Sequence, residues 1–282
     1  MDPVRYRILG TTQALRPDGT VVPLGGARLR ALLTVLALRA GRTVPVRLLV
    51  DEVWDGGPPA DATGALQALV GRLRRARGAD AVASGDGGYR LTAPADDVDL
   101  HRFGRWAGEG LRALADGEPA RAALVLDDAL ALWRGPALTD LPCRTAEAAR
   151  VDALRLDALR ARHGAALALG EAGRALPELT ALCDSHPLDE PLQVLRLRAL
   201  RDAGRAAEAL AAYEDVRRLL AERLGSDPGA ELRSLHAELL KPETASPPRS
   251  ARPGTPGARK PADAPPQPPS SPPPPSSLLS SP

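Results

Sequence analysis

The most constraining stretch of this sequence is GALQALVGRLRRA, from Gly64 to Ala76. Its apolar residues recur at i, i+3, i+4 and i+7, which predicts an amphipathic helix with one buried face: Leu66, Leu69, Val70 and Leu73. The opposite face carries Gly64, Ala68, Gly71 and Arg75, and it is flanked by Gln67, Arg72 and Arg74. No carboxylate occurs between Asp61 and Asp80, so the exposed face of this helix carries only positive charge.

An outer face of this kind can approach a phosphate backbone closely, as a helix in the major groove of DNA must. Taken alone, the stretch is better explained as an arginine-rich helix that faces solvent. The segments on either side of it favour the first interpretation.

Two further helices are predicted before this one. Residues 28–38 place four leucines on one helical face, and a second helix runs from about Pro45, a first-turn residue, to Trp54. The loop from Asp55 to Asp61 then breaks the helical pattern and supplies Asp61 or Thr63 as the N-cap of the third helix.

Short strands are predicted on both sides of these helices. Residues 4–10 and 20–26 read as strands that flank a Pro-Asp-Gly turn, and residues 81–91 read as two strands around a glycine-rich turn. Strands, three helices and a hairpin together predict a winged helix-turn-helix over residues 1–95, an α+β domain in a mainly α chain.

Residues 96–241 are expected to be all α-helical. Three segments, after Leu114, from Glu171 and from Asp202, read as a helix end capped by glycine and followed by a new Ala/Leu-rich helix. Gly173 and Gly204 are 31 residues apart, near the 34-residue period of tetratricopeptide repeats, so we expect a repeat-like helical scaffold. Trp133 and Tyr213 are expected to pack between helices rather than to bind a ligand.

Residues 242–282 have a different composition, with 15 of the 29 prolines of the chain among serine and alanine. Such a segment cannot bury a core and is expected to be a disordered tail or linker, with a proline-rich partner motif as the alternative.

Formal charge divides the two domains. Residues 1–95 contain 13 basic and 8 acidic side chains, a net charge of +5, whereas residues 96–241 contain 20 and 25, a net charge of −5. This asymmetry favours DNA as the partner of the first domain and a protein as the partner of the second. The acidic pair Asp96 and Asp97 is expected to be the hinge between them.

Several functional classes are excluded by what the sequence lacks. Neither lysine follows a glycine as a P-loop requires, and no motif of a serine hydrolase, zinc protease or kinase occurs, so we expect no enzyme and no cofactor. Cys143 and Cys183 are isolated and expected to be structural in a reduced protein, and the four histidines are too scattered to bind a metal. No apolar run is long enough for a membrane span, and no signal peptide begins the chain, so a cytoplasmic location is expected.

Several segments also resemble a known family. The stretches VPLGGARLRALL, LLVDEVW, GALQALVGRLRRA and GGYRL resemble the winged-helix DNA-binding domain of the Streptomyces antibiotic regulatory proteins. The stretches VDLHRF, ALALWRGPAL and LLAERLGSDPGAELRSLHAELL resemble the bacterial transcriptional activation domain of the same family. The resemblance covers residues 3–241 in unbroken order.

The resemblance implies a transcriptional activator of an antibiotic gene cluster. It implies binding to double-stranded DNA at a direct-repeat operator, self-association of protomers side by side on that DNA, and recruitment of the RNA polymerase holoenzyme. Larger members continue into an ATPase module, so this sequence is expected to be either a short member or one that ends in the linker.

Candidate DNA contacts follow from the predicted helices. Gln67, Arg72 and Arg75 are expected nearest to base edges or their flanking phosphates, with Arg74 nearer to the backbone. Arg28 and Arg47 lie at helix starts, where N–H groups also favour phosphate. In the hairpin, Tyr89 is expected to anchor the wing in the core, and Arg90 is expected to have either a phosphate-binding or a structural role.

Three positions depart from the winged-helix pattern. Asp86 stands at the wing tip, where related proteins often carry an arginine, and Ala68 and Gly71 replace bulkier residues on the reading face. We therefore expect DNA shape and phosphate contacts to supply more of the discrimination than usual. Two alternatives stay open: a repeat scaffold whose winged helix binds protein, and the N-terminal part of a larger ATPase regulator.

Overall fold

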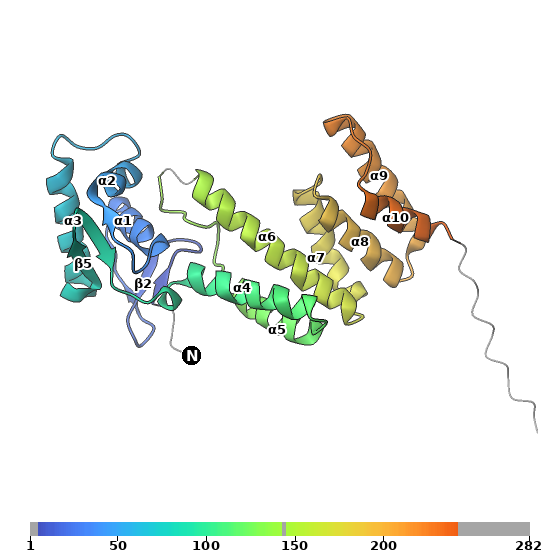
Figure 1. The fold of residues 1–282 in the computed structure, drawn as a ribbon, viewed down its shortest axis with the longest axis horizontal. Helices are drawn as coiled ribbons and strands as arrows, with labels where there is room; N and C mark the ends of the chain where they lie inside the picture. Colours follow the sequence, from blue (N-terminus) through green and yellow to red (C-terminus); the bar gives the residue numbers. More distant parts are fainter. Residues whose placement is uncertain (1–4, 143–144, 242–282) are drawn as a thin grey trace, which may run out of the picture. The chain divides into compact units, whose positions relative to one another are not determined.

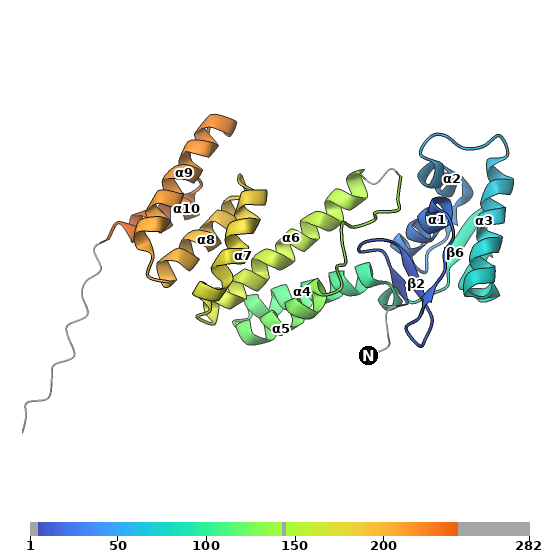
Figure 2. The ribbon, with the colours of Figure 1, turned by 180° about the vertical axis from the view of Figure 1, so that it is seen from behind.

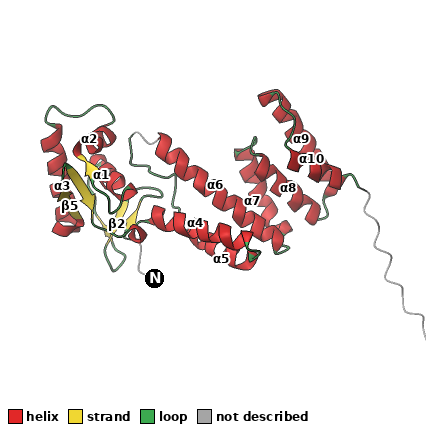
Figure 3. Ribbon diagram, in the orientation of Figure 1, coloured by secondary structure: helices red, strands yellow, loops and turns green. Residues whose placement is uncertain are grey.

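The structure is a computed structural model that describes residues 5–142 and 145–241. The described chain is mainly helical, with small antiparallel sheets near its N-terminus (Figures 1 and 3). The sequence predictions for Val4, for Cys143 and for the tail at 242–282 lie outside the described residues.

The N-terminal elements have the order of a winged helix-turn-helix. They are β1 (Tyr6–Arg7), β2 (Gln13–Leu15), β3 (Val21–Val22), α1 (Ala27–Leu38), β4 (Val44–Pro45), α2 (Val46–Trp54), α3 (Ala62–Arg77), β5 (Val82–Gly85) and β6 (Gly88–Leu91). β1, β2 and β3 form one antiparallel sheet in that order, and β4, β6 and β5 form the other, with β6 in the middle.

Most of the predicted elements are confirmed, and two strands were missed. The three helices and the hairpin lie within two residues of their predicted bounds. The Pro-Asp-Gly turn, however, joins β3 to β2, a strand that the sequence did not predict. Pro45 belongs to the short strand β4 rather than to the first turn of α2, because its ψ of 145° is extended.

The rest of the described chain is helical, as predicted. A short 3₁₀ helix, η2 (Ala95–Asp97), leads into α4 (Asp99–Ala115), α5 (Pro119–Leu130), α6 (Thr145–Ala168), α7 (Ala172–Ser185), α8 (Glu190–Asp202), α9 (Ala206–Leu224) and α10 (Ala230–Leu239). Consecutive helices pack on one another, α4 on α5, α7 on α8 and α8 on α9 (Figure 2). Within the described residues, no helix has both the length and the apolar character that crossing a bilayer requires.

Three of these helices end in the same way. The residues at C′ are Gly117, Gly170 and Gly204, with φ values of +76°, +78° and +74°. In each case the following amide bonds the carbonyl five residues back, and the glycine amide bonds the carbonyl three residues back, which is the Schellman motif. The prediction that Gly173 caps a helix is therefore wrong: Gly173 lies inside α7, and the repeating position is Gly170, 34 residues before Gly204.

Buried apolar side chains form two clusters. The first runs without a break from Tyr6 in β1 to Ala165 in α6, and the second from Ala166 to Leu235. The winged helix therefore shares its hydrophobic core with α4, α5 and α6.

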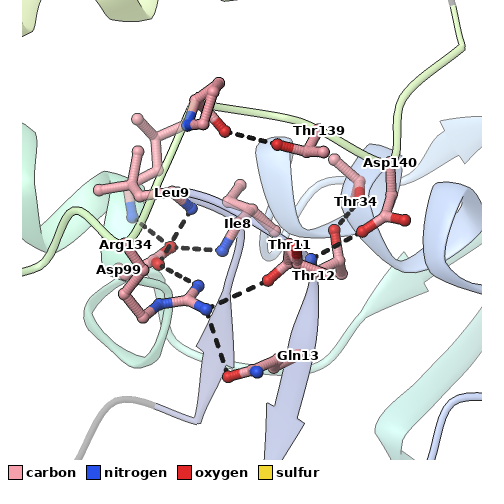
Figure 4. Close-up of polar contacts among 12 residues, drawn as sticks. Ile8, Leu9, Thr11, Thr12, Gln13, Thr34, Asp99, Arg134, Thr139 and Asp140 are labelled. Carbon is pink, nitrogen blue, oxygen red and sulfur yellow. Dashed lines mark hydrogen bonds and ion pairs between the residues drawn. The ribbon is translucent and has the colours of Figure 1, made fainter.

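Polar contacts reinforce this shared core at Asp99, the first residue of α4 (Figure 4). Its carboxylate accepts hydrogen bonds from the backbone amides of Ile8 at 2.8 Å and Leu9 at 3.1 Å, and from its neighbour Leu100 at 2.8 Å. Arg134 lies 3.5 Å away and also bonds the Thr11 carbonyl. Burial raises the pKa of the Asp99 carboxyl, whereas these amides and the Arg134 charge oppose the rise.

A second carboxylate bridges the same two parts of the chain. Asp140 accepts hydrogen bonds from the Thr12 amide at 2.8 Å and from Nε of Arg30, on α1, at 2.7 Å. The Thr12 hydroxyl lies 2.6 Å from that of Thr34, also on α1. The winged helix is thus held through both its first sheet and its first helix.

The chain around the predicted hinge is held by contacts to β1 and the residues beside it. Asp97 is buried, its carbonyl accepts a hydrogen bond from the Arg5 amide at 2.8 Å, and Tyr6 bridges Val98 in parallel. A fragment that ends at residue 95 would lose the acceptor for the Ile8 and Leu9 amides. We therefore expect that fragment to be unstable on its own.

The repeated helix ends generate a first prediction. Replacing Gly170 or Gly204 with alanine places a Cβ in the left-handed region and should lower the free energy of unfolding by about 1–2 kcal/mol. Gly173→Ala is the matched control, because a Cβ there meets no atom within 4 Å, and it should stabilise by about 0.5–1 kcal/mol. Urea unfolding measures all three, and a harmless Gly170→Ala beside a damaging Gly173→Ala would contradict the assignment.

The junction generates a second prediction. Asp99→Ala leaves the amides of Ile8, Leu9 and Leu100 without an acceptor, so the free energy of unfolding should fall by about 3 kcal/mol or more. Asp128→Ala removes an exposed carboxylate on α5 and should change it by less than about 0.5 kcal/mol. Chemical denaturation compares the two, and equal stabilities would show that apolar packing alone holds the junction.

Candidate nucleic-acid interface

α3 has the two faces that its sequence predicts. Leu66, Leu69, Val70 and Leu73 are all buried in the first core, and Gln67, Ala68, Arg72 and Arg75 are exposed. The helix begins after Asp61, whose side chain accepts a hydrogen bond from the Gly64 amide at 2.8 Å, so Asp61 rather than Thr63 is the N-cap. The carboxylate-free face is therefore presented to solvent on a capped, well-packed helix.

The arginines of α3 differ in what they contact. Arg75 is exposed and forms no hydrogen bond or ion pair with any residue that the structure describes. Arg72 donates a hydrogen bond to the Gly25 carbonyl at 2.7 Å, just before α1. Arg74 donates from Nε to the Val82 carbonyl and from a terminal nitrogen to the Ser84 hydroxyl, both at 2.9 Å.

Arg74 therefore braces the wing against α3. Its two acceptors both lie on β5, the strand that begins the hairpin. Arg77, which the sequence analysis did not single out, has a similar role on the other side: its guanidinium lies over the Tyr6 ring at 5.1 Å and donates to the Tyr6 hydroxyl at 3.3 Å. Nothing in the spacing of the α3 arginines distinguishes Arg74 and Arg77, which brace neighbouring strands, from the exposed Arg75.

The remaining predicted arginines are dispersed around the same domain. Arg28 donates to the Val53 carbonyl at 2.5 Å and so ties the start of α1 to the end of α2. Arg47 is 94% exposed, with Asp51 at 4.0 Å. Arg90 is exposed on β6 opposite Ala83, without a polar partner in the described part of the chain.

The wing is short and carries an acidic tip. Tyr89 pairs with Val44 of β4 and packs partly buried on the first core, which confirms its predicted anchoring role. Asp86 is exposed in the turn between β5 and β6. Arg90 is thus the exposed cation that the hairpin itself supplies, and it lies behind the tip rather than at it.

The described residues contain no candidate metal centre. No group of three or more His, Cys, Asp or Glu side chains is close enough there to hold a metal ion. Burial raises the pKa of the Cys183 thiol to about 11, so this cysteine stays protonated and packs as a small apolar residue. Trp133 packs edge-on against Phe103, and Tyr213 stacks on His236, which confirms both as packing residues.

Comparisons with known proteins agree with this architecture. Residues 98–240 match the Bacterial transcriptional activator domain family. Regulatory protein DnrI of Streptomyces peucetius is 36% identical over 252 residues, covering 84% of this chain and 92% of DnrI. Regulatory protein AfsR of Streptomyces griseus is 38% identical over 242 residues, covering 85% of this chain and 25% of AfsR.

A solved structure is also similar. Mycobacterium tuberculosis EmbR in complex with a low affinity phosphopeptide matches with a TM-score of 0.79 at 34% identity, covering 83% of this chain and 64% of that chain. The elements described above define a winged helix joined to an all-helical domain. The chain belongs to the bacterial transcriptional activator domain family, among the Streptomyces antibiotic regulatory proteins, which are transcriptional regulators. It spans about a quarter of the length of AfsR.

The division of the α3 arginines generates a third prediction. Arg74→Ala removes two hydrogen bonds to β5 and should lower the free energy of unfolding by about 1–2 kcal/mol, with faster hydrogen exchange in the hairpin amides. Arg75→Ala, one residue away, should leave stability within about 0.5 kcal/mol. Denaturant unfolding with exchange mass spectrometry separates the two variants, and identical profiles would mean that Arg74 does not brace the wing.

Proposed function

We propose that this chain is a sequence-specific DNA-binding transcriptional activator, acting in the cytoplasm on a gene cluster for antibiotic or other secondary-metabolite biosynthesis. The observation that carries the proposal is the outer face of α3, which is exposed, cationic and free of carboxylates. Relatives named as regulatory proteins, of which DnrI is covered almost entirely, support it. No enzymatic activity is part of the proposal.

Within this proposal α3 enters the major groove. Gln67, Arg72 and Arg75 face base edges or the adjacent phosphates. The two arginines differ in whether the side chain must first give up a contact within the protein. Arg75 is free to bind, whereas Arg72 would exchange its bond to the Gly25 carbonyl for one to DNA. Arg74 stays on β5 and contributes by positioning, with its positive charge still near the backbone.

Phosphate contacts complete the proposed footprint. Arg47 and Arg90 are exposed and available for them, and Arg28 lies at the start of α1 beside the amides of its first turn. Because Asp86 occupies the wing tip, the wing should contribute through Arg90 and through the shape of the groove rather than through insertion of a cation.

The helical domain is the proposed contact for other proteins. We propose that residues 96–241 form a tetratricopeptide-like scaffold, which the 34-residue spacing of Gly170 and Gly204 supports. Its net charge of −5 favours association with basic surfaces. In this proposal it holds protomers side by side on direct repeats and recruits RNA polymerase holoenzyme, while residues 242–282 serve as a tail or linker.

Footprinting of the promoters next to its gene tests the proposal. The purified full chain should protect two direct repeats whose centres are about 10–10.5 bp apart, one turn of the duplex. Inserting about 5 bp turns the second site to the opposite face and should abolish cooperative binding while single-site binding survives.

A variant series assigns that binding to α3. Arg72→Ala with Arg75→Ala should weaken operator binding by about 1–3 kcal/mol for each contacting arginine. Arg16→Ala, which removes one exposed charge from the N-terminal sheet region, is the matched control and should have little effect. Unchanged affinity in the folded double variant would exclude α3 as the reading helix, and equal occupancy at every spacing would exclude the tandem arrangement.

A further inference from the structure

Residues of α7, α8 and α9 line a groove that the proposed DNA contacts do not use. One part, of about 550 Å³, is bordered by Gly173, Leu176, Pro177 and Thr180 of α7 and by Ala211 and Ala212 of α9. A second part, of about 360 Å³, continues past Cys183 and Gln193. The two parts share three residues and therefore form one groove, called the α7–α9 groove below: Arg196, Ala212 and Asp215.

Arg196, on α8, lies where the two parts of the groove meet. It is half-buried, its Nε is enclosed without an acceptor, and it forms no ion pair with any residue of the described chain. Its neighbours are different: Arg198 pairs with Glu231 at 2.9 Å and Arg201 with Glu238 at 3.2 Å. Because no counter-ion in the described chain pairs with this partly buried guanidinium, its terminal nitrogens are available for charge-assisted hydrogen bonds to an anion.

The other charges along the groove are already compensated or lie at one end. Glu208 pairs with Arg205 at 2.6 Å, and Asp215 pairs with Arg218 at 3.2 Å. Asp184 stands at the far end, beside Cys183. A carboxylate would therefore bind on the side of Arg196 that faces Leu176 and Leu200, away from Asp184.

An unused backbone acceptor in the groove indicates that the occupant is a polypeptide rather than a simple anion. Pro177 has no N–H, so the carbonyl of Gly173 lacks its usual donor four residues along α7. An extended peptide supplies an N–H donor for this oxygen and a carboxylate for Arg196.

The dimensions agree with such a ligand. From Gly173 to Asp184 the groove follows 11 residues of α7, which is about 16 Å of helix. That length matches about five residues of extended chain. The walls between the polar positions are apolar, with Leu176, Leu200 and Val216 buried along them.

We propose that the α7–α9 groove binds an extended segment of a partner protein that places an aspartate or glutamate, flanked by apolar residues, against Arg196. This surface lies on the helical domain, and the assignment does not depend on whether α3 reads DNA.

Peptide binding by the full chain tests this assignment. The probes are immobilised ten-residue peptide pools with a central Asp or Glu between Leu, Val and Ala, each paired with the same pool carrying Asn or Gln. The acidic pools should be retained at least tenfold better. Dissociation constants of the best acidic peptide, measured by fluorescence anisotropy, should then rise at least tenfold with Arg196→Gln.

Two variants on the same helices sharpen the result. Arg198→Gln removes an equivalent charge from α8 outside the groove and should leave peptide affinity unchanged. Gly173→Leu fills the groove where a Cβ meets no atom within 4 Å, so it should block the peptide without unfolding the chain. Promoter binding should be equal in all of these variants, which separates failure of this inference from failure of the proposed function.

Three outcomes would overturn the assignment. Equal retention of the acidic and amide pools would exclude a carboxylate ligand, and equal effects of Arg196→Gln and Arg198→Gln would exclude the groove as its site. Self-association that is lost in Arg196→Gln, without any peptide binding, would assign the groove to a second copy of the chain.

Discussion

The buried carboxylate of Asp99 joins the first sheet of the winged helix to the first helix of the activator domain. Because it accepts the amides of Ile8 and Leu9, the start of α4 is fixed to the strand region that follows β1. Arg77 in turn holds the end of α3 on Tyr6 of β1. The orientation of the proposed reading helix relative to α4 is therefore set by contacts within the chain. The two domains differ in net charge, but they share one hydrophobic core.

Sequence patterns could predict the helices but not the strands β2 and β4. α1, α2 and α3 each repeat apolar residues over at least two turns, and that pattern specifies both the element and its buried face. β2 has three residues and β4 has two, too few for an alternating pattern, and β4 also depends on β6, a partner that is distant in the sequence. The role of Asp99 was hidden for the same reason, because an aspartate that begins a helix gives no sign of an acceptor role toward amides in another sheet.

The sequence could predict which face of α3 is exposed, but not which of its arginines already bond other parts of the protein. Helical spacing placed Gln67, Arg72 and Arg75 on the exposed face of α3, as the structure does. It could not show that Arg74 is committed to β5, since the carbonyl it bonds is eight residues ahead on another element. The glycine that ends α6 was assigned wrongly for a similar reason. Gly170 and Gly173 are equally plausible helix-ending residues in the sequence, and only the backbone conformation distinguishes them.

The break between the two hydrophobic cores has a consequence for how such regulators diverge. Since the first core extends through Ala165 and the second begins at Ala166, exchange of sequence between relatives near residue 95 would cut through packed side chains and mismatch both halves. A crossover in the turn at Gly170, by contrast, would interrupt a loop between two helices and leave the first core intact. The α7–α10 helices can in this way be exchanged between relatives as one cassette, with the packing of the winged helix on α4, α5 and α6 left unchanged.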